Sequence, residues 1–221
     1  MQAPTVYVTG TDTGVGKTLA AAALVHAARR QGLRAAGMKP VASGCERTPE
    51  GWRNGDALML QAASDPRPRY EDVNPFALPV PTAPQLAARD AGIEVTLESL
   101  VAAHARLAAG TDRVVVEGAG GWMAPLADGL EQCALARALE AEVVLVVGLR
   151  LGCLSHARLT ARAIEADGLR LAGWIASAVD PAFERAEEYL GLLREAIPAP
   201  CLGVIPYMTN PDPAAAASAI T

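Results

Sequence analysis

A glycine-rich loop between an apolar run and a helical pattern constrains the fold of this chain more than any other feature. The loop is GTDTGVGKT (10–18), which follows TVYVT and precedes LAAAALV. A turn that ends in Gly-Lys-Thr, entered from a strand and left into a helix, is typical of phosphate-binding loops. Gly14 and Gly16 allow successive backbone N–H groups to form an anion site at the helix N-terminus. The loop therefore predicts nucleotide binding, with an ordinary strand-to-helix turn as the alternative.

Two side chains of the loop have expected roles, although the spacing of the loop is unusual. Thr11 stands where the common pattern has its first glycine. Lys17 is expected to reach the terminal phosphates of a nucleotide, and the hydroxyl of Thr18 is expected to complete the shell of a Mg²⁺ ion. The sequence therefore predicts a nucleotide site of a variant kind.

Short apolar runs alternate with longer helical patterns along the chain. Strands are predicted at 5–9, 34–39, 112–118, 142–148, 171–177 and 201–206. Helices are predicted at 18–31, before Gly32, and near 84–91, 97–109, 131–140, 155–167 and 181–196. Strands that are apolar on both faces indicate a mainly parallel sheet with helices on both faces and ligands at the carboxyl ends of the strands. We predict a single α/β domain over residues 1–221, similar to P-loop NTPases, with residues 44–83 as long surface connections.

Charge and cysteine content exclude several classes of function. The 221 residues include 19 Lys or Arg and 24 Asp or Glu, without a basic block that would grip a nucleic-acid backbone. The four cysteines are far apart and form no C-x-x-C pair for a zinc or redox site. No apolar run reaches the ~18 residues that span a bilayer, and the N-terminus shows no secretory signal. We expect a cytoplasmic protein with neither nucleic acid nor membrane as its partner.

Two further stretches place charged side chains where ligands of such a fold bind. Lys39 in GMKPVASG (37–44) ends an apolar strand, although a solvated charge at a strand end is the alternative. Asp56 in RNGDALML (53–60) begins a helical pattern, where a role as the N-cap is equally compatible with the sequence. Both residues are candidates for the site.

Glu117 in VVVEGAGGW (114–122) completes this group of candidates. It ends a strand of valines, where a carboxylate is costly to bury unless a metal or a cation pairs with it. The glycines after it allow the backbone to approach a ligand closely. Thr18, Asp56 and Glu117 together offer hard oxygen ligands, which suit a Mg²⁺ ion that keeps several waters and binds nucleotide phosphates.

Taken together, VTGTDTGVGKT and these three stretches resemble the dethiobiotin synthetase family, and the resemblance extends from about Val6 to Met208. It implies an ATP-dependent, Mg²⁺-dependent ligase of biotin biosynthesis that acts as a homodimer. CO2 and an amine of 7,8-diaminononanoate would form a carbamate, which ATP phosphorylates. The neighbouring amine would then close a cyclic urea, with dethiobiotin, ADP and phosphate as the products.

The resemblance also implies the role of each site residue. The catalytic residues would be Lys39, Lys17 and Thr13. The nucleotide would contact Gly14, Val15, Gly16, Lys17, Thr18, Leu19, Asp56, Glu117, Gly118, Ala119, Gly120, Ser177, Pro206, Tyr207 and Met208. The metal ligands would be Thr18, Asp56 and Glu117, and the substrate would contact Ser43, Thr13, Gly152, Cys153, Leu154 and Ser155. The last four lie in RLGCLSHA (150–157), where free N–H groups of a helix N-terminus would capture the substrate carboxylate, often across the dimer interface. A plain strand-to-helix turn is the alternative there.

Two positions depart from the family pattern. Ser177 stands where the family commonly has an asparagine that reads the adenine ring, and a hydroxyl cannot make the paired contacts of an amide. The base of the nucleoside triphosphate is therefore left open. Gly14 replaces an acidic residue found in some members, and we expect binding to survive this change.

Two other P-loop classes are the alternatives. Partition-type ATPases switch a dimeric scaffold by hydrolysis and carry an extra lysine in the loop, but Asp12 occupies that position here. Amidoligases of cobalamin synthesis need a glutaminase domain, for which 221 residues leave no room, although a separate chain could supply one.

Overall fold

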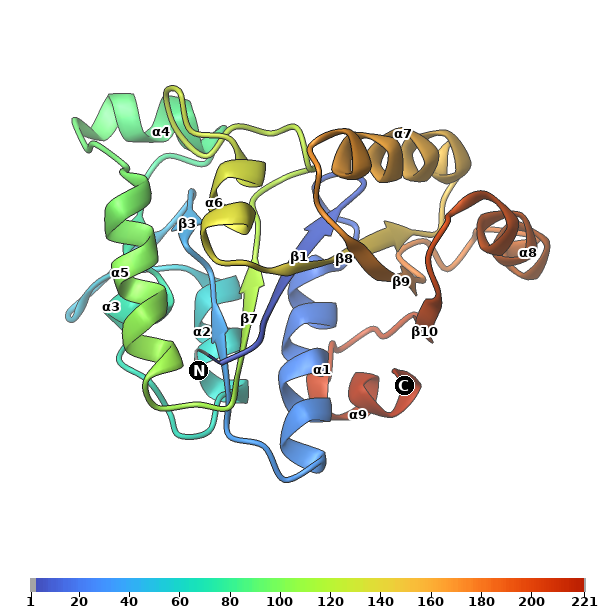
Figure 1. Ribbon diagram of the computed structural model, residues 1–221, viewed down its shortest axis with the longest axis horizontal. Helices are drawn as coiled ribbons and strands as arrows, with labels where there is room; N and C mark the ends of the chain where they lie inside the picture. The colour runs from blue at the N-terminus through green and yellow to red at the C-terminus, as the bar shows by residue number, and fades with distance from the viewer. Residues whose placement is uncertain (1–2, 221) are drawn as a thin grey trace.

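A parallel sheet runs through the centre of the computed structural model, which describes residues 3–220 (Figure 1). Its strands are β1 (Thr5–Gly10), β2 (Ala35–Met38), β7 (Arg113–Glu117), β8 (Glu142–Gly148), β9 (Leu171–Ser177) and β10 (Cys201–Ile205). They lie in the order β10-β9-β8-β1-β7-β2, and every neighbouring pair is parallel. The predicted fold class is confirmed, and each predicted strand lies within one residue of its expected ends.

Helices cover both faces of this sheet (Figure 1). They are α1 (Lys17–Arg30), α2 (Gly55–Ala63), α3 (Tyr70–Val73), α4 (Pro84–Ala91), α5 (Leu97–Ala108), α6 (Gln132–Ala138), α7 (Cys153–Ala166), α8 (Ala186–Ala196) and α9 (Pro213–Ala216), with a 3-10 turn at Ala217–Ala219. The predicted helices are all present. Helix α8 begins five residues later than predicted, because Arg185 has a φ of +63° and cannot continue a right-handed helix.

Successive residues of the strands enter different hydrophobic layers, as the alternation of side chains along a strand requires. In β7, Val114 and Val116 pack with α5 and α6, whereas Val115 between them packs with α1 and α2. All three side chains are fully buried. The apolar run that predicted a strand buried on both faces is therefore explained by two helical layers.

The strand order reverses at β1, which lies between β7 and β8. Connections that leave the carboxyl ends of strands on the two sides of such a reversal diverge and open a crevice for ligands. The loop after β1 and the loop after β7 meet here. A Cβ added at Gly121 would lie 3.5 Å from the carbonyl oxygen of Gly10. The topology thus places the phosphate-binding loop beside the glycine loop that follows Glu117.

The prediction of surface connections over residues 44–83 is wrong for much of that segment. It contains the hairpin of β4 (Glu46–Thr48) and β5 (Gly51–Arg53), the helices α2 and α3, and β6 (Phe76–Ala77), which pairs with β3 (Val41–Ala42). Leu60 of α2 and Leu78 are fully buried. The Pro, Arg and Gly residues of the segment obscured a short helix that packs against α1 and β2.

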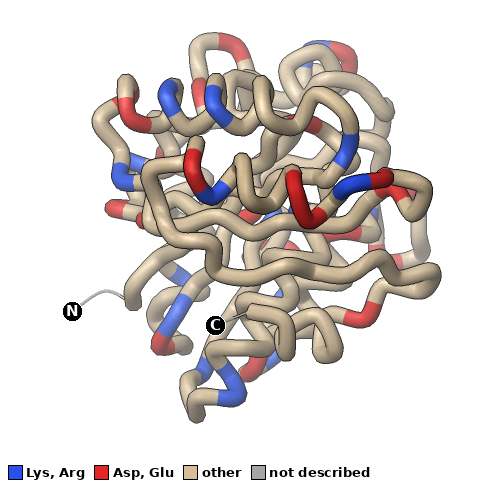
Figure 2. The backbone as a smooth tube through the Cα atoms, turned by 90° about the vertical axis from the view of Figure 1, so that its right-hand side faces the viewer, with Lys and Arg blue, Asp and Glu red and all other residues tan. Residues whose placement is uncertain are grey.

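Acidic and basic residues are interspersed along the chain (Figure 2). Several of them form ion pairs, such as Arg34 with Asp112 at 2.8 Å. Within residues 3–220, no helix has both the length and the apolar character needed to cross a bilayer.

Candidate functional site

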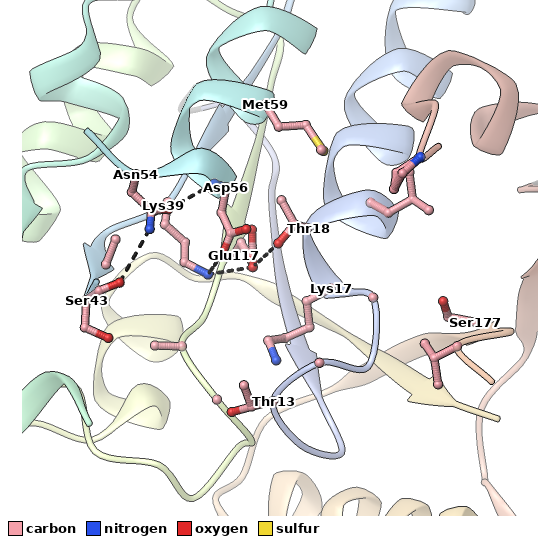
Figure 3. Close-up of a pocket in the computed structure, with 18 of the residues that line it drawn as sticks. Thr13, Lys17, Thr18, Lys39, Ser43, Asn54, Asp56, Met59, Glu117 and Ser177 are labelled. Atoms are coloured by element: carbon pink, nitrogen blue, oxygen red, sulfur yellow. Dashed lines mark hydrogen bonds and ion pairs between the residues drawn. The ribbon is translucent and has the colours of Figure 1, made fainter. Parts of the chain in front are cut away.

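A cavity of about 910 Å³ opens at the carboxyl edge of the sheet, beside the reversal of strand order (Figure 3). The predicted residues that line it are Thr13, Gly14, Gly16, Lys17, Thr18, Leu19, Lys39, Ser43, Asp56, Glu117, Ala119, Gly120, Ser177, Pro206, Tyr207 and Met208. Two predicted residues lie just behind this lining. Val15 is buried beneath the loop, and the carbonyl oxygen of Gly118 faces Lys39 at 3.4 Å. The structure thus brings most of the predicted site together.

Two glycines with left-handed backbone angles shape the phosphate-binding loop. Gly14 has a φ of +72° and Gly16 a φ of +86°, a region that favours glycine. A Cβ added at Gly16 would lie 2.4 Å from the hydroxyl oxygen of Ser177. The loop therefore rests directly against the end of β9, and α1 starts immediately after Gly16. This backbone fits a concave anion site at a helix N-terminus.

Lys17 extends into the cavity from the first turn of α1 (Figure 3). Its ammonium group donates to the backbone carbonyl of Asp12 at 2.7 Å. Burial lowers the pKa of Lys17 to about 8, and the positive charge of Lys39 adds to this effect. Phosphate groups bound at the loop would stabilise the charged form and raise this pKa again.

Affinity for a nucleoside triphosphate is expected to fall as the pH rises above about 8, the pKa of Lys17 in the free protein. Bound phosphates raise that pKa, so the complex keeps a proton that the free protein loses. The affinity should be level below this pH and fall by up to about tenfold per pH unit above it.

Equilibrium binding of a non-hydrolysable triphosphate across this range would measure the effect. Because Lys17 and Lys39 are the only lysines in the sequence, amine acylation followed by peptide mass spectrometry would report the protonation of Lys17 directly. An affinity that stays level throughout would show that Lys17 remains charged in the free protein.

Lys39 lies at the centre of a cluster of ion pairs (Figure 3). Its Nζ atom donates to Oε1 of Glu117 at 2.6 Å and lies 3.2 Å from Oδ2 of Asp56. Burial disfavours the charge on Lys39, but the two carboxylates outweigh burial and raise its pKa. Lys39 therefore keeps its positive charge, and both lysines of the chain present ammonium groups to one cavity.

Glu117 has an unused acceptor atom that fits a metal ion. Its Oε1 atom also accepts a hydrogen bond from the hydroxyl of Thr18 at 2.9 Å, whereas its Oε2 atom is buried without a hydrogen-bond partner among the described residues. An unpaired buried carboxylate oxygen is costly. Residues 3–220 contain no cluster of three His, Cys, Asp or Glu side chains that could hold a metal. The hydroxyl of Thr18 and the carboxylates of Asp56 and Glu117 are oxygen donors of the kind that suits Mg²⁺, which takes many of its other ligands from water and phosphate.

Asn54, for which the sequence predicted no role, positions Asp56. Its side-chain oxygen accepts hydrogen bonds from the backbone N–H groups of Asp56 and Ala57, at 3.0 and 3.2 Å. Asn54 is therefore the N-cap of α2, and the alternative role of Asp56 as the cap is wrong. An asparagine just before a helical run was the signal that could have identified it. Other lining residues that the sequence did not indicate include Met59, Thr82 and Ala124.

The end of the cavity beyond Gly16 is mainly apolar. Ser177, the last residue of β9, lines it together with Pro206, Tyr207 and Met208 from the segment after β10. Ser177 is buried against the loop, whereas the ring of Tyr207 is half exposed. Aromatic and thioether groups suit contact with the face of a flat ring rather than recognition of its edge.

The segment predicted to bind the substrate carboxylate lies outside this cavity. Gly152 is the N-cap of α7 and residues 153–155 form its first turn, but none of these residues lines the cavity. The N–H group of Cys153 donates to the carbonyl of Arg150 at 3.1 Å, so it is not free as expected. Arg150 also links this segment to the phosphate-binding loop, because its guanidinium donates to Oδ2 of Asp12 at 2.7 Å.

Several known proteins of similar sequence carry the same name. A family model described as an AAA domain matches residues 4–215. The ATP-dependent dethiobiotin synthetase BioD of Xanthomonas oryzae pathovar oryzae is 60% identical over 219 residues, which cover 99% of this chain and 97% of that protein. Proteins of the same name from Xanthomonas axonopodis pathovar citri and Xylella fastidiosa are 59% and 58% identical, over 97% and 91% of this chain and 96% and 89% of their own lengths.

Solved structures show the same fold at low sequence identity. The signal recognition particle receptor FtsY of Elizabethkingia anophelis, in complex with GDP, aligns with a TM-score of 0.54 and 18% identity over 97% of this chain and 60% of that one. The cell division protein ftsY of Thermotoga maritima aligns with a TM-score of 0.55 and 15% identity over 98% of this chain and 68% of that one. This chain thus spans about 60% of the length of the first of these structures, and the likeness concerns the fold alone.

Proposed function

The chain belongs to the dethiobiotin synthetase family, and from this premise we propose how its cavity carries out the reaction. It is an ATP-dependent ligase of biotin biosynthesis that forms dethiobiotin. The observation that carries the proposal for the site is the contact of 2.6 Å between Lys39 and Glu117 beside the phosphate-binding loop. This contact lies in the cavity beside the phosphate-binding loop and supports a site in which a fixed cation and a carboxylate act on the phosphate group in transfer.

We propose three chemical steps. CO2 adds to one amine of 7,8-diaminononanoate to give a carbamate, and a proton is released. A carbamate oxygen then attacks the terminal phosphorus of ATP, and ADP leaves. The neighbouring amine attacks the carbamate carbon, the ring closes with loss of a proton, and phosphate leaves with the former carbamate oxygen.

The side chains act mainly by position and charge, as is usual for phosphoryl transfer. Lys17 would bind the terminal phosphates, and Lys39 would stabilise the charge on the carbamate and on the phosphate in transfer. Thr13 and Ser43 face the same cavity and would hydrogen-bond the diamine or its carbamate (Figure 3). None of these steps needs a covalent bond to the protein.

We propose that Thr18, Asp56 and Glu117 hold a Mg²⁺ ion with the nucleotide. The ion would supply charge stabilisation to the phosphate oxygens. The buried Oε2 atom of Glu117, which lacks a partner in the described part of the chain, supports this assignment. Lys39 contacts both carboxylates and would keep them in place before the nucleotide arrives.

We also propose a homodimer, supported by exposed apolar side chains in and beside α7 and in the loop between β7 and α6. Leu151, Met123 and Leu159 are 82%, 69% and 63% exposed. A second copy that covers such side chains would remove apolar surface from water. Residues 152–155 do not line the cavity of their own subunit. In a dimer, they would meet the substrate carboxylate in the cavity of the other subunit.

The two alternative P-loop classes are not favoured. Asp12, which replaces the lysine of partition-type ATPases, is engaged by Arg150 within the same chain. Full-length relatives at about 60% identity carry the name of the synthetase rather than that of a scaffold or an amidoligase.

The phosphorylated carbamate can be tested by isotope transfer. The protein is incubated with MgATP, the diamine and bicarbonate labelled with heavy oxygen, and the released phosphate is analysed by mass spectrometry. The proposed steps predict one labelled oxygen in the phosphate for each dethiobiotin formed. Phosphate whose new oxygen comes from water would contradict the phosphorylated carbamate.

Replacing Ser177 by asparagine is expected to raise selectivity for ATP over other triphosphates by about five- to tenfold. An amide would extend from the end of β9 with both a donor and an acceptor, and a hydrogen bond of this kind contributes about 1 kcal/mol. The measurement is kcat/KM for ATP, GTP, CTP and UTP in the native protein and the variant. Ser177→Ala serves as the control and should keep the native profile. An unchanged profile in Ser177→Asn would show that position 177 does not face the base.

A further inference from the structure

A buried glutamine holds the glycine loop that forms one wall of the cavity. Gln132 is the first residue of α6 and is fully buried. Its amide nitrogen lies within hydrogen-bond distance of the carbonyl oxygens of Ala119, Gly121 and Ala124, at 2.8, 2.5 and 3.0 Å. One side chain therefore fixes three points of the loop between β7 and α6.

Tyr7 fixes the orientation of this amide from the centre of the sheet. Its hydroxyl donates to the Oε1 atom of Gln132 at 3.0 Å, across 125 residues of sequence. Because that oxygen accepts from Tyr7, the amide NH2 group must face the loop. The ring of Tyr7 also packs edge-on against Trp122 of the same loop, with 6.0 Å between ring centroids. Tyr7 thus fixes the position of the glycine loop relative to β1, the strand that leads into the phosphate-binding loop.

The glycine after Glu117 makes this arrangement possible. A Cβ added at Gly118 would lie 2.1 Å from the Oε1 atom of Gln132 and 3.0 Å from the hydroxyl of Tyr7. A contact of 2.1 Å with a fully buried amide could not be relieved without moving the loop. The absence of a side chain at Gly118 therefore leaves room for the Tyr7–Gln132 pair as well as for a ligand.

The loop that Gln132 holds contacts residues assigned to the diamine and its carbamate. Ala119, Gly120 and Ala124 line the cavity. A Cβ added at Gly120 would lie 3.8 Å from the hydroxyl oxygen of Thr13, and the carbonyl of Gly118 lies 3.4 Å from the ammonium of Lys39. We propose that Gln132 is a positioning residue that sets this wall for the diamine substrate, an inference that rests on the proposed function.

Gln132→Met tests the proposal because methionine has a similar length but cannot donate to the loop. The KM for the diamine is expected to rise by about tenfold or more, the size of effect seen when outer partners of a site are lost. The dissociation constant of MgATP should change by less than about twofold, since Lys17 and the phosphate-binding loop keep their contacts. Steady-state kinetics and calorimetry with the full-length protein measure the two quantities.

Gln61→Met is the matched control. Gln61 is a buried glutamine of α2 that donates to the carbonyl of Pro68 at 3.0 Å and does not line the cavity. Its loss should lower thermal stability without changing the KM for the diamine. Tyr7→Phe, which removes one hydroxyl, is the second test if Gln132→Met fails to fold, and it should raise the KM by about fivefold.

Gln132→Glu adds a readout that a purely structural role would not produce. Its carboxyl group can donate to a loop carbonyl only when it is protonated, and burial favours protonation. Relative to the native protein, kcat/KM for the diamine should recover as the pH falls in this variant and not in Gln132→Met.

Suppose that the native protein forms dethiobiotin. If the KM for the diamine is then unchanged in Gln132→Met, or changes equally in Gln61→Met, the inference about Gln132 is overturned and the proposed function stands. A native protein that forms no dethiobiotin would overturn the proposed function and this inference with it.

Discussion

Replacing Lys39 by alanine is expected to lower diamine-dependent turnover by about a thousandfold, in line with the loss of a fixed group that stabilises developing charge. Lys39 is buried just after β2, 2.6 Å from Glu117, and its pKa is raised, so it carries its positive charge in the free protein. Nucleotide affinity should change by less than about fivefold, because Lys17 and the loop backbone are untouched. Single-turnover kinetics and calorimetric binding of MgATP measure the two effects.

The stability of the variant needs a separate control, because Lys39→Ala leaves buried Glu117 without its cation. Removing one partner of a buried pair costs about 3–5 kcal/mol. Lys39→Met keeps the bulk of the side chain and should show the same loss of turnover. Thermal unfolding with and without Mg²⁺ identifies any unfolded fraction. Full turnover in Lys39→Ala would remove this residue from the site, and retained nucleotide-driven dimer switching without synthesis would favour a scaffold.

Replacing Glu117 by glutamine is expected to raise the half-saturating Mg²⁺ concentration by about a hundredfold, the upper end of effects seen when even the outer partners of a metal site are lost. The amide keeps the size of the side chain and its ability to accept from Thr18 and Lys39, but it loses the negative charge. The measurement is the dependence of turnover on free Mg²⁺ at saturating nucleotide.

Glu142→Gln is the matched control for this variant. Glu142 lies at the opposite, amino end of β8 and pairs with Arg170 on the surface. Its replacement should leave the Mg²⁺ dependence unchanged. If Glu117→Gln also keeps the native Mg²⁺ dependence, Glu117 is not a ligand, and its buried Oε2 atom needs another explanation.

The central sheet was predictable because its signals are local. Three consecutive valines in β7 can be buried only when both faces of the strand are covered. The glycine-rich loop indicates a strand before it and a helix after it, which are β1 and α1. Residues 44–83 were not predictable in the same way. Leu60 is buried because it packs where Gly37 leaves room, with a Cβ at that glycine only 2.8 Å from the leucine side chain. A contact between residues so far apart leaves no periodic pattern.

The candidate site divides in the same way. Lys17, Lys39 and Glu117 could be identified because each stands at a strand end or a helix start, where such a fold binds ligands. Gln132 carried no signal, since its role depends on Tyr7 and on three carbonyl groups of another segment. Asp56 was identified as a site candidate, but its alternative role as the N-cap of α2 was wrong, because Asn54, two residues earlier, is the N-cap.

The measurement that tests the account most directly is release of nucleoside diphosphate from each common triphosphate, with Mg²⁺ and bicarbonate, in the presence and absence of 7,8-diaminononanoate. We expect release that depends on the diamine and is matched by an equal amount of dethiobiotin, and the same data give the base preference that Ser177 leaves open. Release that is indifferent to the diamine and yields no dethiobiotin would contradict the account and make a nucleotide-switched scaffold the better explanation of this cavity.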